Sequence, residues 1–220
     1  MILVLGDSFT AGSGLADYDP TNPYSKYSWP SLLEQQTGIT VENRAEPGAS
    51  NAQILNQFLT YYDQGKHVAV IVLWSFLSRI YFPDPNNSDT LITGRTTTPT
   101  NSTSQLNRIL EFYYKYFYSD KVSTWELNGF QLILQNKARC PVLHDCVDTQ
   151  ANTHSLDANI NWIDSTCPTS FNNAWVKQGK KIGSQGNHYS EGTHKFWVEN
   201  YVIPALKRCL DLDSIQQTKP

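Results

Sequence analysis

The sequence lacks an excess of charge of either sign and a long apolar run. Its 220 residues carry 17 Lys and Arg against 20 Asp and Glu, a net charge of −3, which gives no electrostatic reason to bind a phosphate backbone. The longest apolar run, residues 68–74, spans 7 residues, whereas a membrane-spanning helix needs about 20. We therefore expect neither a nucleic-acid partner nor a membrane span.

Signatures of disulfide scaffolds, metal sites and export are also missing. Four cysteines are too few and too scattered for a disulfide framework. Residues 140–148 contain Cys, His and Asp, but their spacing fits no common zinc motif, so we expect no metal. Gly12-Ser13-Gly14 lacks the third glycine of a dinucleotide loop, so no cofactor is expected. Residues 2–5 are apolar with no basic leader before them, which favours a cytoplasmic protein.

Apolar, strand-like segments alternate with helical patterns in the first half of the chain. The expected strands are 2–5, 40–43, 68–73 and 140–143, and the expected early helices are 30–36 and 51–63. The first and third strands are continuously apolar, which is typical of parallel strands covered on both faces. This order predicts a single α/β domain over residues 1–220, a three-layer α/β/α sandwich with right-handed crossovers.

The second half of the chain is less regular. In residues 83–104, 16 of 22 positions are Thr, Ser, Asn or Pro, which predicts a long loop and suggests a lid. An aromatic helix is expected at 105–118, as a packing element or a substrate-facing wall, and another helix at 122–136. Residues 190–210 predict an amphipathic helix with a kink or break at Pro204. Residues 147–187 support no assignment.

The strongest chemical signal is Gly6-Asp7-Ser8 at the carboxyl end of the first strand. Open α/β sheets bind ligands at that end of their strands. Glycine permits a sharp turn, and Ser8 would stand beside a helix amino terminus, whose unpaired N–H groups can stabilise an oxyanion. A serine in this place can also be only a helix cap. The tripeptide alone leaves both interpretations open.

Three further segments follow in order: 43–51 (Asn-Arg-Ala-Glu-Pro-Gly-Ala-Ser-Asn), Trp74-Ser75, and His188 before the last helix. Together with residues 6–12 (Gly-Asp-Ser-Phe-Thr-Ala-Gly), they resemble the sequence blocks of the SGNH (GDSL) hydrolase superfamily over nearly the whole chain. The resemblance implies a flavodoxin-like parallel sheet within the sandwich. It also implies hydrolysis of esters through a serine acyl-enzyme.

The resemblance gives roles to particular residues. Ser8 is the expected nucleophile, and His188 is the base that it needs, because a free hydroxyl reacts poorly. The N–H groups of Ser8 and Gly48 are expected to donate to the developing oxyanion, and glycine at position 48 permits close approach. A position before a helix amino terminus should keep His188 neutral. Asp7 is expected to hold the turn, and His194 to pack in the core.

One departure from the family pattern lies after the third strand. The family usually has an Asn there as a further oxyanion donor, but this chain reads Trp74-Ser75-Phe76-Leu77-Ser78-Arg79. The motif Trp-Ser/Thr-x-x-x-Arg resembles a divergent subgroup associated with viral and phage genomes. The Ser75 hydroxyl could act as an oxyanion donor. The Arg79 guanidinium could bind an oxyanion or an anionic substrate group, or Arg79 could be a surface residue.

A second departure concerns the acid that orients the histidine, which the family places three residues before it. Position 185 is Gln in this chain. Either Ser8 and His188 act as a dyad, with Gln185 or a backbone carbonyl fixing the tautomer, or a carboxylate arrives from elsewhere, with Asp164 as the first candidate and Asp157 as the second. Losing an orienting Asp can cost about 10⁴ in turnover, so slow catalysis or none stays open.

Three functions are therefore in competition. The leading hypothesis is a serine esterase or acylhydrolase acting on a small-molecule or carbohydrate ester, including carbohydrate O-acetyl groups. The alternative is a degenerate hydrolase scaffold that binds a glycan or an anionic ligand. The third is a structural or assembly protein of a virion, with the Thr-rich loop as a contact surface; a viral protein would lie in the host cytoplasm or the virion.

Overall fold

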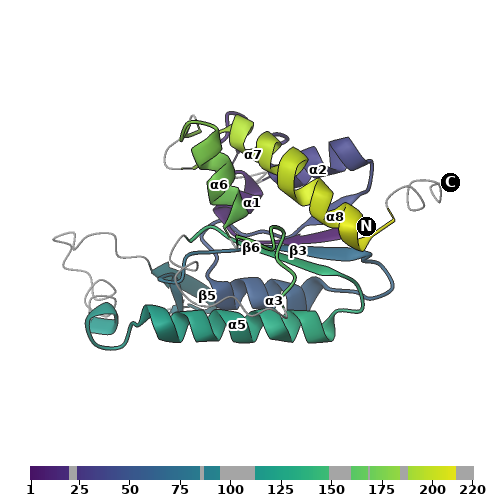
Figure 1. Ribbon diagram of the computed structural model, residues 1–220. Coiled ribbons are helices and arrows are strands. Elements are labelled where there is room, and N and C mark those ends of the chain that lie inside the picture. The colour runs from purple at the N-terminus through teal and green to yellow at the C-terminus, as the bar shows by residue number, and fades with distance from the viewer. Residues whose placement is uncertain are drawn as a thin grey trace.

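A computed structural model describes residues 1–19, 24–84, 87–94, 112–148, 160–167, 169–183 and 188–211 (Figure 1). The named elements are β1 (Ile2–Leu5), α1 (Ser8–Ala11), α2 (Trp29–Thr37), β2 (Val41–Asn43), α3 (Asn51–Tyr61), β3 (Ala69–Trp74), β4 (Ile80–Asp84), β5 (Asn87–Gly94), α5 (Asp120–Lys137), β6 (Val142–Cys146), α6 (Ser170–Lys177), α7 (Glu191–Trp197), the π-helical turn η2 (Val198–Val202) and α8 (Ile203–Cys209).

A parallel sheet of four strands, in the order β2-β1-β3-β6, forms the centre of the fold. The sheet extends past β6 by one bridge between His144 and Trp162. There the His144 N–H donates to the Asn161 carbonyl, and the Ile163 N–H donates to the His144 carbonyl, each at 2.9 Å. The α/β sandwich around a parallel sheet, predicted from the alternation of apolar strands and helices, is confirmed.

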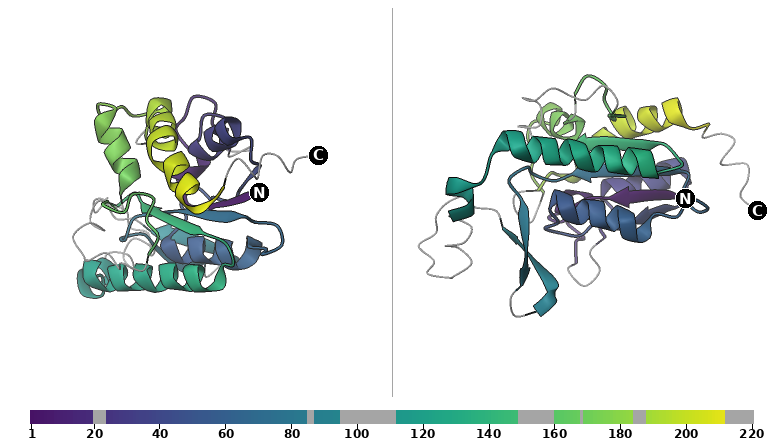
Figure 2. Two further views of the ribbon diagram at one scale, coloured as in Figure 1. Left: turned by 45° about the vertical axis from the view of Figure 1, so that its right-hand side comes forward. Right: turned by 90° about the horizontal axis from the view of Figure 1, so that it is seen from below.

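Helices cover both faces of the sheet (Figures 1 and 2). On one face, the side chains of Ile2 and Val4 belong to a core built with α2, α6, α7, η2 and α8. On the other face, Leu3 and Leu5 belong to a core built with α3 and α5. Successive residues of a strand point to opposite faces, so a strand buried on both sides must be apolar throughout. This is why β1 and β3 carry unbroken apolar runs.

The prediction of a loop over residues 83–104 is wrong for residues 83–84 and 87–94, which belong to two strands. Strands β4 and β5 form an antiparallel hairpin in which Tyr81 pairs with Thr93 and Phe82 pairs with Ile92. Thr and Ile favour extended backbone, and an antiparallel pair needs no continuous apolar sequence. The polar composition therefore concealed a hairpin, which projects beside the sheet in Figure 2. Residues 95–104 of the expected loop lie outside the described residues.

The carboxyl-terminal helix predicted at 190–210 is present as α7, η2 and α8 in one helical run. It does not break at Pro204. Instead, the Ile203 N–H donates to the Val198 carbonyl, one residue farther back than in an α-helix. Proline has no N–H to donate, and the wider turn just before Pro204 takes the helix past it.

The other helical predictions agree with the structure where it describes them. The helix expected at 51–63 is α3, which ends two residues earlier, at Tyr61, and residues 122–136 lie within α5. Of the aromatic helix expected at 105–118, only 112–118 are described, and 112–116 are helical. A further helix, α6, lies where the sequence pattern supported no assignment. No helix among the described residues has the length and apolar character needed to cross a membrane.

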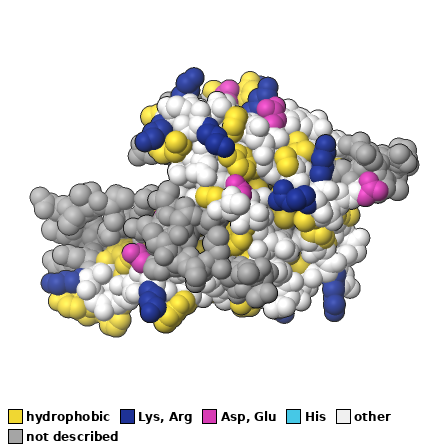
Figure 3. Space-filling model, viewed as in Figure 1, with side chains coloured by type: hydrophobic (Ala, Val, Ile, Leu, Met, Phe, Trp, Pro, Cys, Tyr) yellow, Lys and Arg dark blue, Asp and Glu magenta, His cyan; other side chains and the backbone are white. Residues whose placement is uncertain are grey.

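Neither the charged side chains on the face shown in Figure 3 nor the possible metal ligands gather into one cluster among the described residues. On this face, basic and acidic side chains of the described residues are interspersed. Within the ranges that the structure describes, no group of three or more His, Cys, Asp and Glu side chains is placed to hold a metal ion.

His194 on α7 is fully buried, and burial lowers its pKa to about 3. Its Nδ1 accepts the Trp29 N–H at 3.1 Å. In the unfolded chain histidine titrates near 6.5, so between these values the unfolded state binds one more proton. The buried, neutral His194 therefore contributes to the free energy of unfolding. Its contribution is complete above pH 6.5 and is lost as pH falls toward 3, by up to about 1.4 kcal/mol per pH unit.

We therefore expect His194→Gln to flatten the pH dependence of stability. Between pH 4 and 6, the free energy of unfolding of this variant should change less steeply than that of the parent, by about 1.4 kcal/mol per pH unit. Urea denaturation at several pH values measures both slopes. A folded variant with the parent's slope would contradict the assignment.

Candidate active site

The turn after β1 is held by close packing and by one side chain of α3. A Cβ on Gly6 would lie 2.1 Å from Thr10 Oγ1 and 3.1 Å from the Leu73 carbonyl oxygen, so glycine is required there. The buried Gln57 side chain accepts the Gly6 N–H at its Oε1 and donates from its Nε2 to the Gly6 carbonyl, both at 3.1 Å. Sequence patterns offered no signal for this clamp.

Ser8 is the first residue of α1, with Asp7 as the helix cap. Asp7 Oδ1 accepts the Phe9 N–H at 3.0 Å, and the Asp7 carbonyl accepts the N–H groups of Thr10 and Ala11. Within the described part of the chain, the Ser8 N–H has no recorded acceptor. It therefore remains available at a helix start, where backbone donors favour a negative charge.

The structure brings the two ends of the chain together at this point. Nε2 of His188 lies 2.9 Å from Oγ of Ser8, which is hydrogen-bond distance. The His188 ring packs against Phe9, with 4.9 Å between ring centroids. A base and a hydroxyl at this separation can exchange a proton directly.

Two glycines let the backbone close around His188. Gly14 has a φ of +85, in the left-handed region that favours glycine. A Cβ on Gly14 would lie 2.9 Å from the His188 Cβ and 3.2 Å from its Nδ1. A Cβ on Gly183 would lie 2.4 Å from the Gly14 carbonyl oxygen, while the Gly183 N–H donates to the His188 carbonyl at 2.7 Å. The sequence analysis considered Gly14 only as part of a dinucleotide loop.

The pKa of His188 is lowered, as the sequence predicted, but the causes differ. Burial is the largest cause; the Arg79 charge also lowers this pKa, while the Asp7 charge raises it. The sequence analysis attributed the neutral ring to a helix amino terminus, yet α7 begins only at Glu191. A neutral imidazole is the form that accepts a proton from Ser8.

Asp7 is fully buried and paired with Arg79. Its Oδ2 accepts the Arg79 Nη1–H at 2.7 Å and the Ser75 hydroxyl at 2.8 Å. The same Arg79 nitrogen donates to the Ala49 carbonyl at 3.1 Å. Because the Ser75 hydroxyl already donates to Asp7, this arrangement does not support the predicted oxyanion role of Ser75. Arg79, whose side chain is 12% exposed, is a largely buried counter-ion of Asp7, and a contact with substrate remains a prediction.

Gly48 lies in a turn that is attached to the same edge of the sheet. The Ala49 N–H donates to the Glu46 carbonyl at 3.0 Å, and the Glu46 N–H donates to the Gly6 carbonyl at 3.1 Å. With Pro47 before it and a φ of +89, Gly48 occupies the position of a type II turn that strongly favours glycine. The predicted oxyanion role of its N–H remains a prediction.

No carboxylate among the described residues is hydrogen-bonded to Nδ1 of His188. Asp164, the first candidate, instead accepts the N–H and the hydroxyl of Thr166. Asp157 and Gln185 lie outside the described residues. Among the described residues, His188 contacts Ser8 without a carboxylate on its other ring nitrogen, and the choice between a dyad and a triad stays a prediction.

A sequence model described as GDSL-like Lipase/Acylhydrolase matches residues 2–120. The chain belongs to this family. A search of curated proteins finds no significant match. The GDSL block itself is residues 6–9, where Phe9 stands in the last position.

Solved structures share the fold of this GDSL-family chain at low identity. The psychrotrophic esterase EstA from Pseudoalteromonas sp. aligns at 13% identity with a TM-score of 0.53, over 94% of this chain and 96% of its own. TesA aligns at 15% identity with a TM-score of 0.52, over 95% of this chain and 99% of its own. Phospholipase A1 from Streptomyces albidoflavus aligns at 13% identity with a TM-score of 0.50, over 95% of this chain and 98% of its own. At these identities the likeness shows the fold alone.

Gly14→Ala should displace the His188 ring and reduce kcat by about 10²-fold in any reaction that uses this base, because the new methyl group overlaps the ring's position. Gly38→Ala is the matched control, since Gly38 also has positive φ, +67, but nothing lies within 4 Å of its Cβ position. Both variants should lose stability, and only Gly14→Ala should lose turnover. Equal effects of the two on kcat would contradict this role.

Charge substitutions beside His188 should shift its pKa in opposite directions. Arg79→Gln removes a charge that lowers this pKa and should raise it, whereas Asp7→Asn should lower it further. Nuclear magnetic resonance titration of the His188 ring measures the pKa without requiring activity. The acid limb of kcat/KM should move with it, because the base must be neutral.

Arg79→Lys keeps the positive charge and is the control for this pair of variants. Arg79→Gln leaves the Asp7 carboxylate buried without its partner, which costs about 3–5 kcal/mol, so thermal unfolding should confirm that the titrated protein is folded. A His188 pKa that moves the same way in Asp7→Asn and Arg79→Gln would refute the electrostatic assignment.

Proposed function

We propose that this protein is a serine esterase or acylhydrolase in which Ser8 is the nucleophile and His188 is the general base. The observation that carries the proposal is the 2.9 Å contact between Ser8 Oγ and His188 Nε2 at the start of α1. Membership of the GDSL-like lipase and acylhydrolase family supports ester hydrolysis as the reaction class. Serine and histidine in this arrangement occur on unrelated folds for acyl transfer.

The reaction divides into two transfers. In the first, His188 Nε2 takes the Ser8 proton as Oγ attacks the ester carbonyl carbon, and the N–H groups of Ser8 and Gly48 donate to the resulting oxyanion. Collapse expels the alcohol, which takes the proton from His188 and leaves an acyl-enzyme on Ser8. In the second, His188 takes a proton from the water molecule that attacks the acyl carbonyl. The bond between the acyl carbon and Ser8 Oγ then breaks, His188 returns the proton to Oγ, and the acid is released.

The imidazolium formed in each step is stabilised by a nearby negative charge. Asp7 is adjacent to Ser8 in sequence, and its charge favours the protonated form of His188. Arg79 opposes this effect, and it also donates a hydrogen bond to the buried Asp7 carboxylate. We propose that the Ser8–His188 dyad uses this through-space stabilisation by Asp7 in place of a carboxylate hydrogen-bonded to Nδ1.

Small esters, including O-acetyl groups of carbohydrates, are the proposed substrates. EstA is described as an esterase and the Streptomyces protein as phospholipase A1, so ester chemistry is found on this fold. A second candidate function is a binding module that retains the fold without turnover. The absence of a carboxylate on His188 Nδ1 among the described residues favours it.

Ser8→Ala should abolish labelling by a fluorophosphonate probe and lower kcat/KM for short p-nitrophenyl esters by at least about 10³-fold. The exposed serine variant Ser165→Ala is the control and should label and turn over like the parent. Peptide mass mapping should place the label on Ser8. A parent protein that neither labels nor hydrolyses these esters would leave the binding module as the function.

A further inference from the structure

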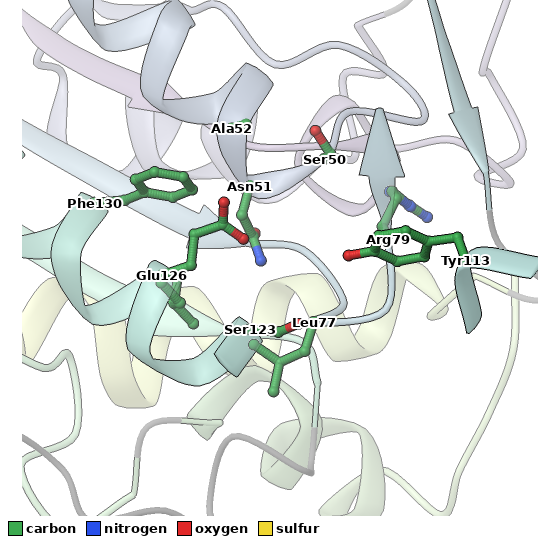
Figure 4. A pocket seen from close by; sticks show the side chains of 10 residues that line it. Ser50, Asn51, Ala52, Leu77, Arg79, Tyr113, Ser123, Glu126 and Phe130 are labelled. Carbon is green, nitrogen blue, oxygen red and sulfur yellow. The ribbon is translucent and has the colours of Figure 1, made fainter. Parts of the chain in front are cut away.

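A cavity of about 260 Å³ lies between the amino-terminal ends of α3 and α5 (Figure 4). The described side chains that shape it include Asn51 and Ser50 from the start of α3, Leu77 and Arg79 from the segment after β3, and Glu126 from α5. Both helix ends lie at the carboxyl edge of the sheet, the edge from which Ser8 projects. The volume is just below the roughly 300–1,000 Å³ of pockets for drug-sized ligands, so one small unit fits.

A short hydrogen-bonded path connects this cavity to the catalytic turn. Asn51 Oδ1 accepts the Ser75 N–H at 2.8 Å, and the Ser75 hydroxyl donates to Asp7 at 2.8 Å. Arg79 reaches the same Asp7 oxygen from the cavity wall. The cavity is thus separated from the residue before Ser8 by one layer of side chains.

The cavity wall offers hydrogen-bond donors. Asn51 is only 8% exposed, and its Oδ1 is already taken by Ser75, so its amide nitrogen is directed into the cavity, as Figure 4 shows. No acceptor for this nitrogen is recorded among the described residues. Arg79 uses one nitrogen for Asp7 and Ala49, which leaves the rest of its guanidinium on the cavity wall.

The opposite wall offers an acceptor and determines the charge. The Glu126 carboxylate points toward Asn51 across the cavity (Figure 4). Since Asp7 offsets the charge of Arg79, Glu126 leaves the lining with a net negative charge, which repels an anionic group. A cationic group, which carries only donors, would find an acceptor in Glu126 but would face the donor groups of Asn51 and Arg79 on the other wall. A hydroxyl group can donate to Glu126 and accept from Asn51 at once.

We infer that this cavity binds a single neutral, hydroxyl-bearing ring, a sugar unit, of the substrate. As the assignment of a substrate class, this inference rests on the proposed function. The apolar walls formed by Leu77, Leu127 and Phe130 suit the C–H faces of such a ring, while Glu126 and Asn51 select its hydroxyl groups. The ester carried by the ring would then lie toward Ser8.

Binding is measured in the Ser8→Ala background, so that it does not depend on turnover. Isothermal titration and ligand-observed magnetic resonance would use a panel of methyl pyranosides as neutral probes, glucuronate as the anionic probe and choline as the cationic probe. We expect binding of at least one methyl pyranoside, with an affinity above those of glucuronate and choline. Adding Glu126→Gln should weaken that binding about tenfold, the usual effect of one hydrogen bond to a charged group.

Glu34→Gln, an exposed carboxylate on α2, is the matched control and should leave the pyranoside affinity unchanged. In the parent background, Glu126→Gln should also lower the ratio of kcat/KM for an acetylated methyl pyranoside to that for ethyl acetate. Absence of pyranoside binding, tighter binding of either charged probe, or an unaltered affinity in Glu126→Gln would overturn the inference. Pyranoside binding in a parent that hydrolyses no ester would support the subsite and contradict the proposed hydrolase.

Discussion

The buried ion pair between Asp7 and Arg79 is the interaction on which the site depends. It joins the end of β1 to the segment after β3, and through the Ala49 carbonyl it also holds the turn that contains Gly48. Asp7 is fully buried, and its two oxygens accept three hydrogen bonds, from Phe9, Ser75 and Arg79. A buried charge with its partners in place is tolerated, and one without them is strongly destabilising. The geometry around Ser8 is therefore fixed as a unit.

The same pair sets the electrostatic surroundings of His188. Asp7 favours its protonated form and Arg79 disfavours it, so their effects on the ring oppose each other and burial becomes the largest influence on its pKa. A neutral base at rest is the consequence. In the proposed acyl transfer, the imidazolium would depend on Asp7 for a countercharge, because the structure shows no carboxylate on Nδ1 among the described residues. Burial and Arg79 thus favour a neutral His188 that can accept a proton, while only the Asp7 charge favours the protonated ring.

Much of the fold follows from local sequence. The apolar runs of β1 and β3 are readable without tertiary information, because a strand covered on both faces needs apolar residues in succession. The juxtaposition of Ser8 and His188 was predicted through the order of the sequence blocks. Resemblance was needed because no local rule relates residues 180 positions apart.

What escaped prediction depends on contacts that only the folded chain creates. Arg79 and Asp7 are 72 residues apart, and nothing in either segment identifies the other as its partner. The role of Gly14 follows from the position of the His188 ring, and that of Gln57 from the path of the backbone at Gly6. The hairpin of β4 and β5 was missed for a different reason, since a polar composition fits a loop and an antiparallel pair equally well.

The placement of base and cavity separates chemistry from recognition. His188 packs with Phe9 and belongs with the core on the α6 and α7 face, whereas the cavity beside Asn51 and Leu77 lies on the α3 and α5 face. In the proposed arrangement, the sugar unit would therefore lie on one face of the sheet and the base on the other. Lining residues on α5 can then change without moving His188. The residues after β3 cannot change in this way, because Ser75 and Arg79 hydrogen-bond directly to Asp7, the residue before Ser8.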